Sequence, residues 1–220
     1  MGLQVDVVSD IVCPWCFIGK RRLRGALSHV QGPSIVRWHP MQLYPDVPEQ
    51  GTDLQAYLER RFNNRPAVRV AMEQLTNTGL QLGIHFDFDN IRKLPNTLDA
   101  HRLILSANAV QQDTLVEKLF TGFFEQARDL SDREVLLEIA AESGLDANRA
   151  RATLEDDRTR KGVLEEEQRV KQLGLAGLPN FLVNRKLSVA GAQDSATLLQ
   201  AFDYALFGVP EPDAEAPTLH

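Results

Sequence analysis

Cysteine is almost absent from this chain: only two of its 220 residues are cysteines, Cys13 and Cys16. A secreted disulfide scaffold needs several cysteines spread along the chain, which excludes that class. A structural zinc site needs four ligands, and the five histidines show no paired spacing, so we expect no metal site. Two cysteines three positions apart therefore leave a redox dithiol or a pair of inert side chains.

An excess of positive charge is also lacking, since 30 acidic residues face 24 basic ones and the formal net charge is −6 at pH 7. Proteins that bind nucleic acid depend largely on neutralising phosphates, so we expect no nucleic-acid partner. No apolar run reaches the roughly 18 residues of a membrane span. The N-terminus has no basic region followed by an apolar core, so we expect no membrane partner and, if Met1 is the native start, a cytoplasmic protein. The sequence does not indicate an oligomeric state.

The first 45 residues carry a β-α-β pattern. Residues 3–9 alternate between apolar and polar side chains and then become apolar, which predicts a strand. Pro14 stands where a helix can begin without losing a hydrogen bond, and apolar residues at helical spacing follow it to position 29. Residues 34–39 predict a second strand. The cysteine pair thus lies at the turn from the first strand into the helix.

Residues 46–170 are predicted to form a helical insertion with hardly any strand. Residues 131–134 have the spacing of a capping box that begins at Ser131, and Gly144 and Gly174 stand where helices end. The predicted helices cover residues 52–63, 66–82, 96–111, 113–128, 132–143 and 147–172.

Strand character returns in residues 171–208. Residues 181–183 and 187–189 predict a hairpin around a turn at 184–186, and Asp194 can cap a last helix that ends at Phe207. Residues 209–220 are proline-rich and acidic, and we expect a disordered tail. The order predicts an α/β domain in two parts, 1–45 and 171–208, separated by the insertion 46–170.

The segment Cys13-Pro14-Trp15-Cys16 places Cys13 at the start of a helix. The free N–H groups and the helix dipole there favour a negatively charged sulfur, whereas the nearby Asp10 acts against it. Cys16 follows one turn later and is expected to be buried. This geometry predicts an exposed nucleophilic thiol and a second thiol that closes a disulfide with it.

Four segments together resemble a known family. They are residues 9–19 with the two cysteines, Pro95-Asn96-Thr97 with Ala100-His101-Arg102, residues 174–179 and residues 191–193. The chain resembles the DsbA-like branch of the thioredoxin superfamily, and most closely its FrnE-type dithiol oxidoreductases. These are related to 2-hydroxychromene-2-carboxylate isomerases and kappa-class glutathione transferases. The resemblance implies a thioredoxin-like α/β fold with a large all-helical insertion.

The resemblance also implies roles for particular residues. Pro179 matches the family's cis-proline, which faces the cysteine pair and completes the catalytic site with Cys13 and Cys16. Its cis bond would leave the Leu178 backbone free to pair with an extended substrate. Pro14 and Trp15, between the cysteines, are expected to contact substrate as well.

Asp194 and Ser195 match a polar pair that contacts the γ-glutamyl end of glutathione in glutathione-using relatives. A simple helix cap at Asp194 is the alternative, and both roles are compatible. Asn96 and His101 are expected to line the cleft between the insertion and the sheet. The alternative is a hydrogen bond between helices, with no contact to substrate.

The isomerase and transferase relatives carry a serine where this chain has Cys13, and they lack a second thiol. A cysteine pair can exchange electrons, which favours a thiol-disulfide oxidoreductase or disulfide isomerase. We expect protein disulfides, protein dithiols or glutathione as partners, no tightly bound cofactor, and glutathione as a candidate co-substrate. The alternatives are a glutathione-dependent isomerase or transferase acting on a small aromatic compound, and a non-enzymatic peptide-binding chaperone.

Overall fold

The computed structural model describes residues 2–62 and 65–208. Its centre is a four-stranded sheet in the order β2-β1-β5-β6. Strand β1 (Leu3–Ser9) pairs in parallel with β2 (Ser34–Pro40) and antiparallel with β5 (Asn180–Val183), which in turn pairs antiparallel with β6 (Leu187–Ala190). The first and last parts of the chain therefore build one sheet, as predicted. The predicted disordered tail lies outside the described residues.

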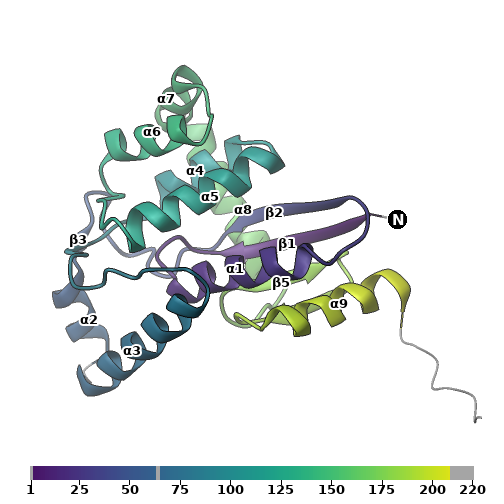
Figure 1. The fold of residues 1–220 in the computed structure, drawn as a ribbon. Helices are drawn as coiled ribbons and strands as arrows, with labels where there is room; N and C mark the ends of the chain where they lie inside the picture. Colours follow the sequence, from purple (N-terminus) through teal and green to yellow (C-terminus); the bar gives the residue numbers. More distant parts are fainter. Residues whose placement is uncertain (1, 63–64, 209–220) are drawn as a thin grey trace, which may run out of the picture.

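Helices cover both faces of this sheet (Figure 1). Helices α1 (Pro14–Leu27) and α9 (Ser195–Phe207) pack side by side on one face, and α8 (Asp157–Gln172) crosses the other. This arrangement confirms the thioredoxin-like α/β fold with a helical insertion. The insertion also contains α2 (Leu54–Phe62), α3 (Arg65–Gln81), α4 (Leu98–Ser106), α5 (Ala109–Phe124), α6 (Arg133–Glu142) and α7 (Ala147–Glu155). Two short strands that the sequence did not predict, β3 (Thr52–Asp53) and β4 (Lys93–Leu94), pair antiparallel within it.

Capping side chains account for three differences between the predicted and the observed helices. The predicted helix 96–111 ends at Ser106, since Asn108 begins α5 with a capping box closed by Gln111. The predicted helix 147–172 is divided at Asp156, whose side chain accepts a hydrogen bond from a backbone N–H of α8. The capping box at Ser131 is not formed, because Asp132 caps α6.

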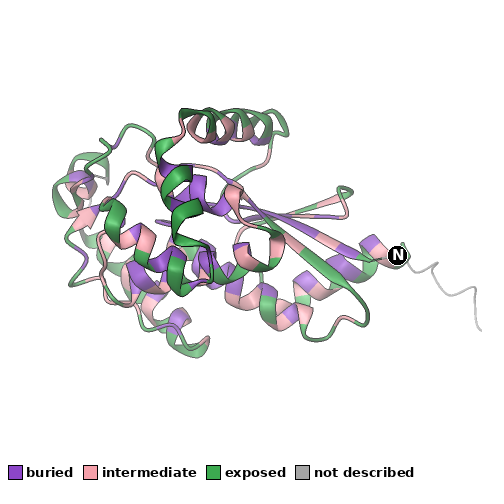
Figure 2. Ribbon diagram, turned by 90° about the horizontal axis from the view of Figure 1, so that it is seen from above, coloured by how far each residue is buried: buried purple, intermediate pink, exposed green. Residues whose placement is uncertain are grey.

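The core is one continuous cluster that joins the sheet to the insertion. Figure 2 shows that buried residues gather where helices and sheet meet, whereas the outward sides of the helices are exposed. The cluster extends from strand β1 through the first turn of α1 to a group of phenylalanines that includes Phe17 and Phe120, whose rings stack 5.1 Å apart. No helix in the described stretches is both long and apolar enough to cross a membrane.

Candidate active site

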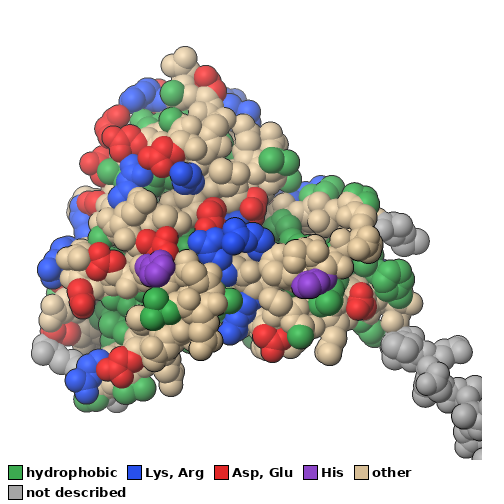
Figure 3. Space-filling view, in the orientation of Figure 1, with side chains coloured by type: hydrophobic (Ala, Val, Ile, Leu, Met, Phe, Trp, Pro, Cys, Tyr) green, Lys and Arg blue, Asp and Glu red, His purple; other side chains and the backbone are tan. Residues whose placement is uncertain are grey.

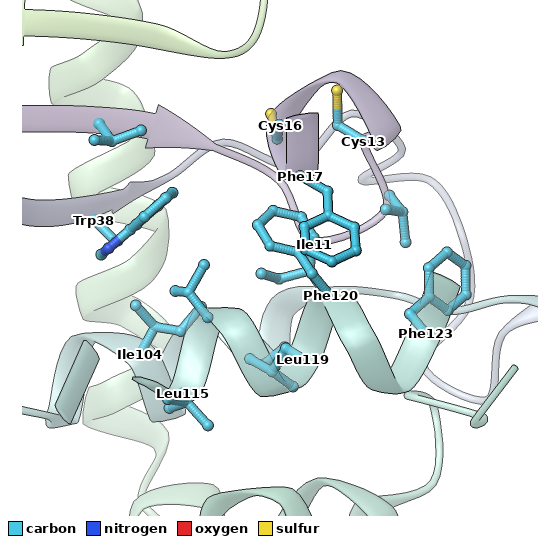
Figure 4. Packing of buried hydrophobic residues seen from close by; sticks show 14 of the residues in the cluster. Ile11, Cys13, Cys16, Phe17, Trp38, Ile104, Leu115, Leu119, Phe120 and Phe123 are labelled. Carbon is cyan, nitrogen blue, oxygen red and sulfur yellow. The ribbon is translucent and has the colours of Figure 1, made fainter. Parts of the chain in front are cut away.

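The two cysteines lie in the first turn of α1. Cys13 is the N-cap residue with extended backbone, Pro14 follows at the first helical position, and the N–H of Cys16 donates to the carbonyl oxygen of Cys13 at 3.0 Å. The Cys13 side chain makes no capping hydrogen bond, and the first turn of α1 contains no acidic residue. Figure 4 shows both sulfur atoms at this end of the helix, with Phe17, Ile11 and Phe120 packed beneath them. Both thiols therefore lie together at this end of the helix.

The burial of the two thiols differs from the prediction in one respect. Cys16 is 1% exposed, as expected, but Cys13 is only 5% exposed, so the prediction of an exposed nucleophile was wrong. Cys13 is buried because the first turn of α1 belongs to the same packed cluster as Ile11 and Val12. Burial raises the pKa of the Cys16 thiol well above its ordinary value, and the neighbouring Cys13 sulfur raises it further. Cys16 is thus held as a neutral thiol, and both cysteines are free.

Pro179 packs directly against α1 close to the cysteines. The Leu178–Pro179 peptide bond is cis, and Pro179 is buried while Leu178 is half-buried. Gly19, one turn after Cys16, provides the space: a Cβ atom there would lie 2.7 Å from Pro179 Cγ. Glycine at this position therefore allows the proline loop to approach the helix. Trp15, between the two cysteines, is 39% exposed.

A fully buried carboxylate lies just before the cysteine turn. Asp10 is 0% exposed; its Oδ2 accepts the backbone N–H of Leu43 at 2.7 Å, and its Oδ1 lies 3.2 Å from His101 Nε2. The carbonyl oxygen of Asp10 accepts the N–H of Cys13 at 3.1 Å. Asp10 thereby connects three segments: the cysteine turn, the loop after β2, and helix α4.

His101 lies inside the protein behind this carboxylate. It is 2% exposed, and its hydrogen-bond partner Asp10 lies in the turn before α1 and not in a helix, so this is not the bond between helices that the alternative described. A cleft role for His101 stays a prediction. With Ser9 and Trp38 it lines a cavity of about 10 Å³. Trp38 Nε1 has no hydrogen-bond partner among the described residues, whereas a hydrogen bond from the Ser9 side chain lowers the pKa of Cys16 against the larger effect of burial.

Tyr44 is a neighbour of Cys13 that the sequence analysis missed. It directly follows Leu43, which Asp10 holds, and it is half-buried against the cluster that contains Cys13. Burial raises the pKa of Tyr44, and the nearby Cys13 sulfur raises it further. No local motif marks this tyrosine, because only the contact between Asp10 and the loop after β2 brings it to the site.

The basic residues that follow the cysteines in α1 are engaged elsewhere. Lys20 Nζ lies 2.5 Å from Asp113 Oδ1, and Arg21 Nη1 lies 2.5 Å from Glu117 Oε1, both acids being on α5. In Figure 3, basic side chains in the middle of the visible face are bordered by acidic ones. These cations are therefore neutralised and do not serve as free charges for the thiols.

Three other predicted site residues have structural partners. Asp194 is the N-cap of α9, where its Oδ1 accepts the N–H of Thr197 at 2.7 Å, and Ser195 Oγ donates to the carbonyl oxygen of Arg22 at 2.8 Å. Asn96 Nδ2 donates to the carbonyl oxygen of Val47 at 2.6 Å. A glutathione contact at Asp194 and Ser195, and a cleft role for Asn96, stay predictions.

Candidate metal ligands do not gather in the part of the chain that the structure describes. Across residues 2–62 and 65–208, no three histidine, cysteine or acidic side chains come together as a metal site requires.

Solved structures of three proteins are similar to this chain over more than nine-tenths of its length. A probable DsbA oxidoreductase from Streptomyces coelicolor is 28% identical, with a TM-score of 0.84 over 97% of this chain and 95% of that one. The cytosolic disulfide reductase DsbM from Pseudomonas aeruginosa, solved with glutathione, is 20% identical with a TM-score of 0.61, covering 92% of this chain and 95% of that one. A 2-hydroxychromene-2-carboxylate isomerase is 14% identical with a TM-score of 0.71, covering 92% and 96%.

The family model of the DsbA-like thioredoxin domain matches residues 4–203. This range includes the cysteine turn, the whole helical insertion and the loop that carries Pro179. The chain belongs to the DsbA-like thioredoxin domain family.

Proposed function

We propose that this protein is a thiol-disulfide oxidoreductase that uses Cys13 and Cys16 as a redox pair. The observation that carries the proposal is the position of two free thiols in one helix turn, the first of them at the N-cap. The positive end of the helix dipole there stabilises the negative charge of an attacking sulfur. The second cysteine is buried directly beside it and can close a disulfide.

The reaction proceeds by two exchanges. The Cys13 thiolate attacks one sulfur of a substrate disulfide, forms a mixed disulfide and releases the other substrate sulfur as a thiolate, which takes up a proton. Cys16 then loses its proton and attacks Cys13 Sγ, so that the Cys13–Cys16 disulfide forms and the second substrate thiolate leaves. Two electrons pass from the protein to the substrate, and oxidation of a substrate dithiol runs the same steps in reverse.

Partners and residue roles belong to the same proposal. We take protein disulfides, protein dithiols and glutathione as the partners; the fold neighbour DsbM, a cytosolic disulfide reductase solved with glutathione, is compatible with this and with a cytoplasmic location. Trp15 and Pro14 would contact the substrate from α1, and Leu178 would pair with its backbone across from the thiols. Asp194 and Ser195 are proposed to receive the γ-glutamyl end of glutathione in addition to their structural bonds.

A second candidate function is a glutathione-dependent isomerase or transferase. The fold neighbour 2-hydroxychromene-2-carboxylate isomerase, with its TM-score of 0.71, favours it. In that chemistry one group holds the glutathione sulfur, and a second thiol has no part in the reaction. Cys16 is therefore the residue that separates the two functions.

The test compares Cys16→Ser and Cys13→Ser with the unchanged protein in reduction of a model protein disulfide. As an oxidoreductase, Cys13→Ser loses exchange altogether, whereas Cys16→Ser keeps the first attack and accumulates a mixed disulfide visible by mass. Turnover that is equal in Cys16→Ser and the unchanged protein would overturn the proposal and favour the glutathione-dependent alternative.

A further inference from the structure

The loop after β2 and helix α2 form an aromatic wall next to Cys13. The Tyr44 ring packs edge-on against the Tyr57 ring with the centroids 5.2 Å apart. Tyr57 Oη lies 3.3 Å from Asp46 Oδ1, and that hydrogen bond fixes the second ring. Because Asp10 holds the backbone at Leu43, the whole wall is tied to the cysteine turn.

A positive charge lies on this wall. The Arg61 guanidinium carbon is 5.8 Å from the centroid of the Tyr44 ring, which is within the range of a cation–π contact. Arg61 is exposed, and the contact that its guanidinium makes among the described residues is the one with the Tyr44 ring. Its charge is therefore available to a bound molecule, in contrast to Lys20 and Arg21, which are paired with α5.

We propose that Arg61, held against Tyr44, binds a carboxylate of the disulfide or thiol whose sulfur reacts at Cys13, so that the site prefers anionic substrates. This inference rests on the proposed thiol-disulfide exchange and names the substrate class for it. A guanidinium is suited to this role because its planar fork matches a carboxylate. The contact with Tyr44 places this charge on the loop that Asp10 ties to the cysteine turn.

The net charge of the protein makes a local cation necessary for such a preference. The chain carries −6 overall, so its long-range field repels anionic substrates. Exposed charges are screened beyond about 8 Å at physiological ionic strength. A preference for anions therefore has to come from a charge that the substrate contacts directly.

Arg60 provides a matched control on the same helix. It is exposed like Arg61, but it lines the groove between α2 and α3 together with Met72 and Phe88. Arg61 lies instead over Tyr44. The variants Arg60→Gln and Arg61→Gln change the net charge of the protein by the same amount, so a difference between them reports position and not overall charge.

The experiment measures the second-order rate of oxidation of the reduced protein by three small disulfides. Glutathione disulfide carries carboxylates, 2-hydroxyethyl disulfide is neutral and cystamine is cationic. We expect Arg61→Gln to slow the oxidation of the protein by glutathione disulfide about tenfold, equivalent to about 1.4 kcal/mol. In the same variant, the rate with the neutral disulfide should change less than about twofold, and cystamine should react no more slowly than with the unchanged protein. Arg60→Gln should leave all three rates within about twofold, because a charge at the rim acts on them only from a distance.

Two results would overturn the inference while leaving the exchange function in place. An equal loss with all three disulfides in Arg61→Gln would mean that Arg61 only supports Tyr44. Equal effects of Arg60→Gln and Arg61→Gln would mean that only overall charge matters. If the unchanged protein is oxidised by none of the three disulfides, the proposed exchange function itself fails, and the inference with it.

Discussion

Gly19 is the contact point between α1 and Pro179, and replacing it by alanine tests how the proline loop is held beside the thiols. An added Cβ would lie 2.7 Å from Pro179 Cγ and 3.1 Å from Phe181 Cζ. Real Cβ atoms essentially never approach within 3.0 Å, so either the proline loop or the helix has to move. Gly162 in α8 is the matched control, because a Cβ there meets no atom within 4 Å.

The magnitudes follow from two opposing effects. Alanine in a helix interior is more favourable than glycine by about 1 kcal/mol. Overpacking a well-filled site costs about 1–3 kcal/mol. Gly162→Ala has only the first effect and should be stabilised by about 1 kcal/mol, whereas Gly19→Ala has both and should lose up to about 2 kcal/mol. The difference between the two variants is the cost of the clash.

The assay combines thermal unfolding with the disulfide-exchange rate. For a protein of this size 1 kcal/mol corresponds to about 2–4 °C in Tm, so the two variants should shift Tm in opposite directions. Exchange should slow in Gly19→Ala, because Pro179 is displaced from the thiols, and stay unchanged in Gly162→Ala. If Gly19→Ala gained stability like Gly162→Ala and kept its rate, the close packing of Pro179 on α1 would be refuted.

Two further predictions concern charged groups. Burial opposes the positive charge on His39, but hydrogen bonds to Asp6 and Glu166 outweigh burial and raise the pKa of His39. The protonated ring therefore stabilises the folded protein fully below about pH 6.5, and this contribution is lost as the pH rises through the higher pKa of the folded state. The difference in unfolding free energy between the unchanged protein and His39→Gln should shrink from pH 6 to pH 9 in urea titrations; a constant difference would contradict this. Asp10→Ala leaves two buried donors without an acceptor, at about 1–3 kcal/mol each, and should lower the urea midpoint much more than Asp10→Asn; equal midpoints would show that the carboxylate does not hold both segments.

Much of the fold could be predicted from the sequence because its signals are local. Strand 3–9 was predicted with the bounds that the structure has, and the hairpin around 184–186 matches β5 and β6 within one residue. The break between α4 and α5 was predicted at residue 112 but lies at residues 107–108, although the signal for its true position is local: Asn108 and Gln111 have capping-box spacing. The sequence analysis gave more weight to the apolar periodicity than to this cap.

Some features of the site could also be predicted from neighbouring residues, and others could not. The position of Cys13 and Cys16 at a helix start depends on neighbouring residues and was predictable. The burial of Cys13 and the approach of Tyr44 depend on Asp10 holding a loop more than 30 positions away, at Leu43, and no local pattern encodes that contact. Gly19 belongs to a segment that carries the family resemblance, but its role of making room for Pro179 depends on a contact with a distant part of the chain.

The central claim is that Cys13 and Cys16 form one redox couple, and a redox titration tests it most directly. The protein is equilibrated across ratios of reduced to oxidised glutathione, free thiols are trapped by alkylation, and the products are measured by mass. The account predicts a single two-electron transition between the dithiol and the Cys13–Cys16 disulfide. A stable glutathione adduct on Cys13, with Cys16 alkylated at every ratio, would contradict it.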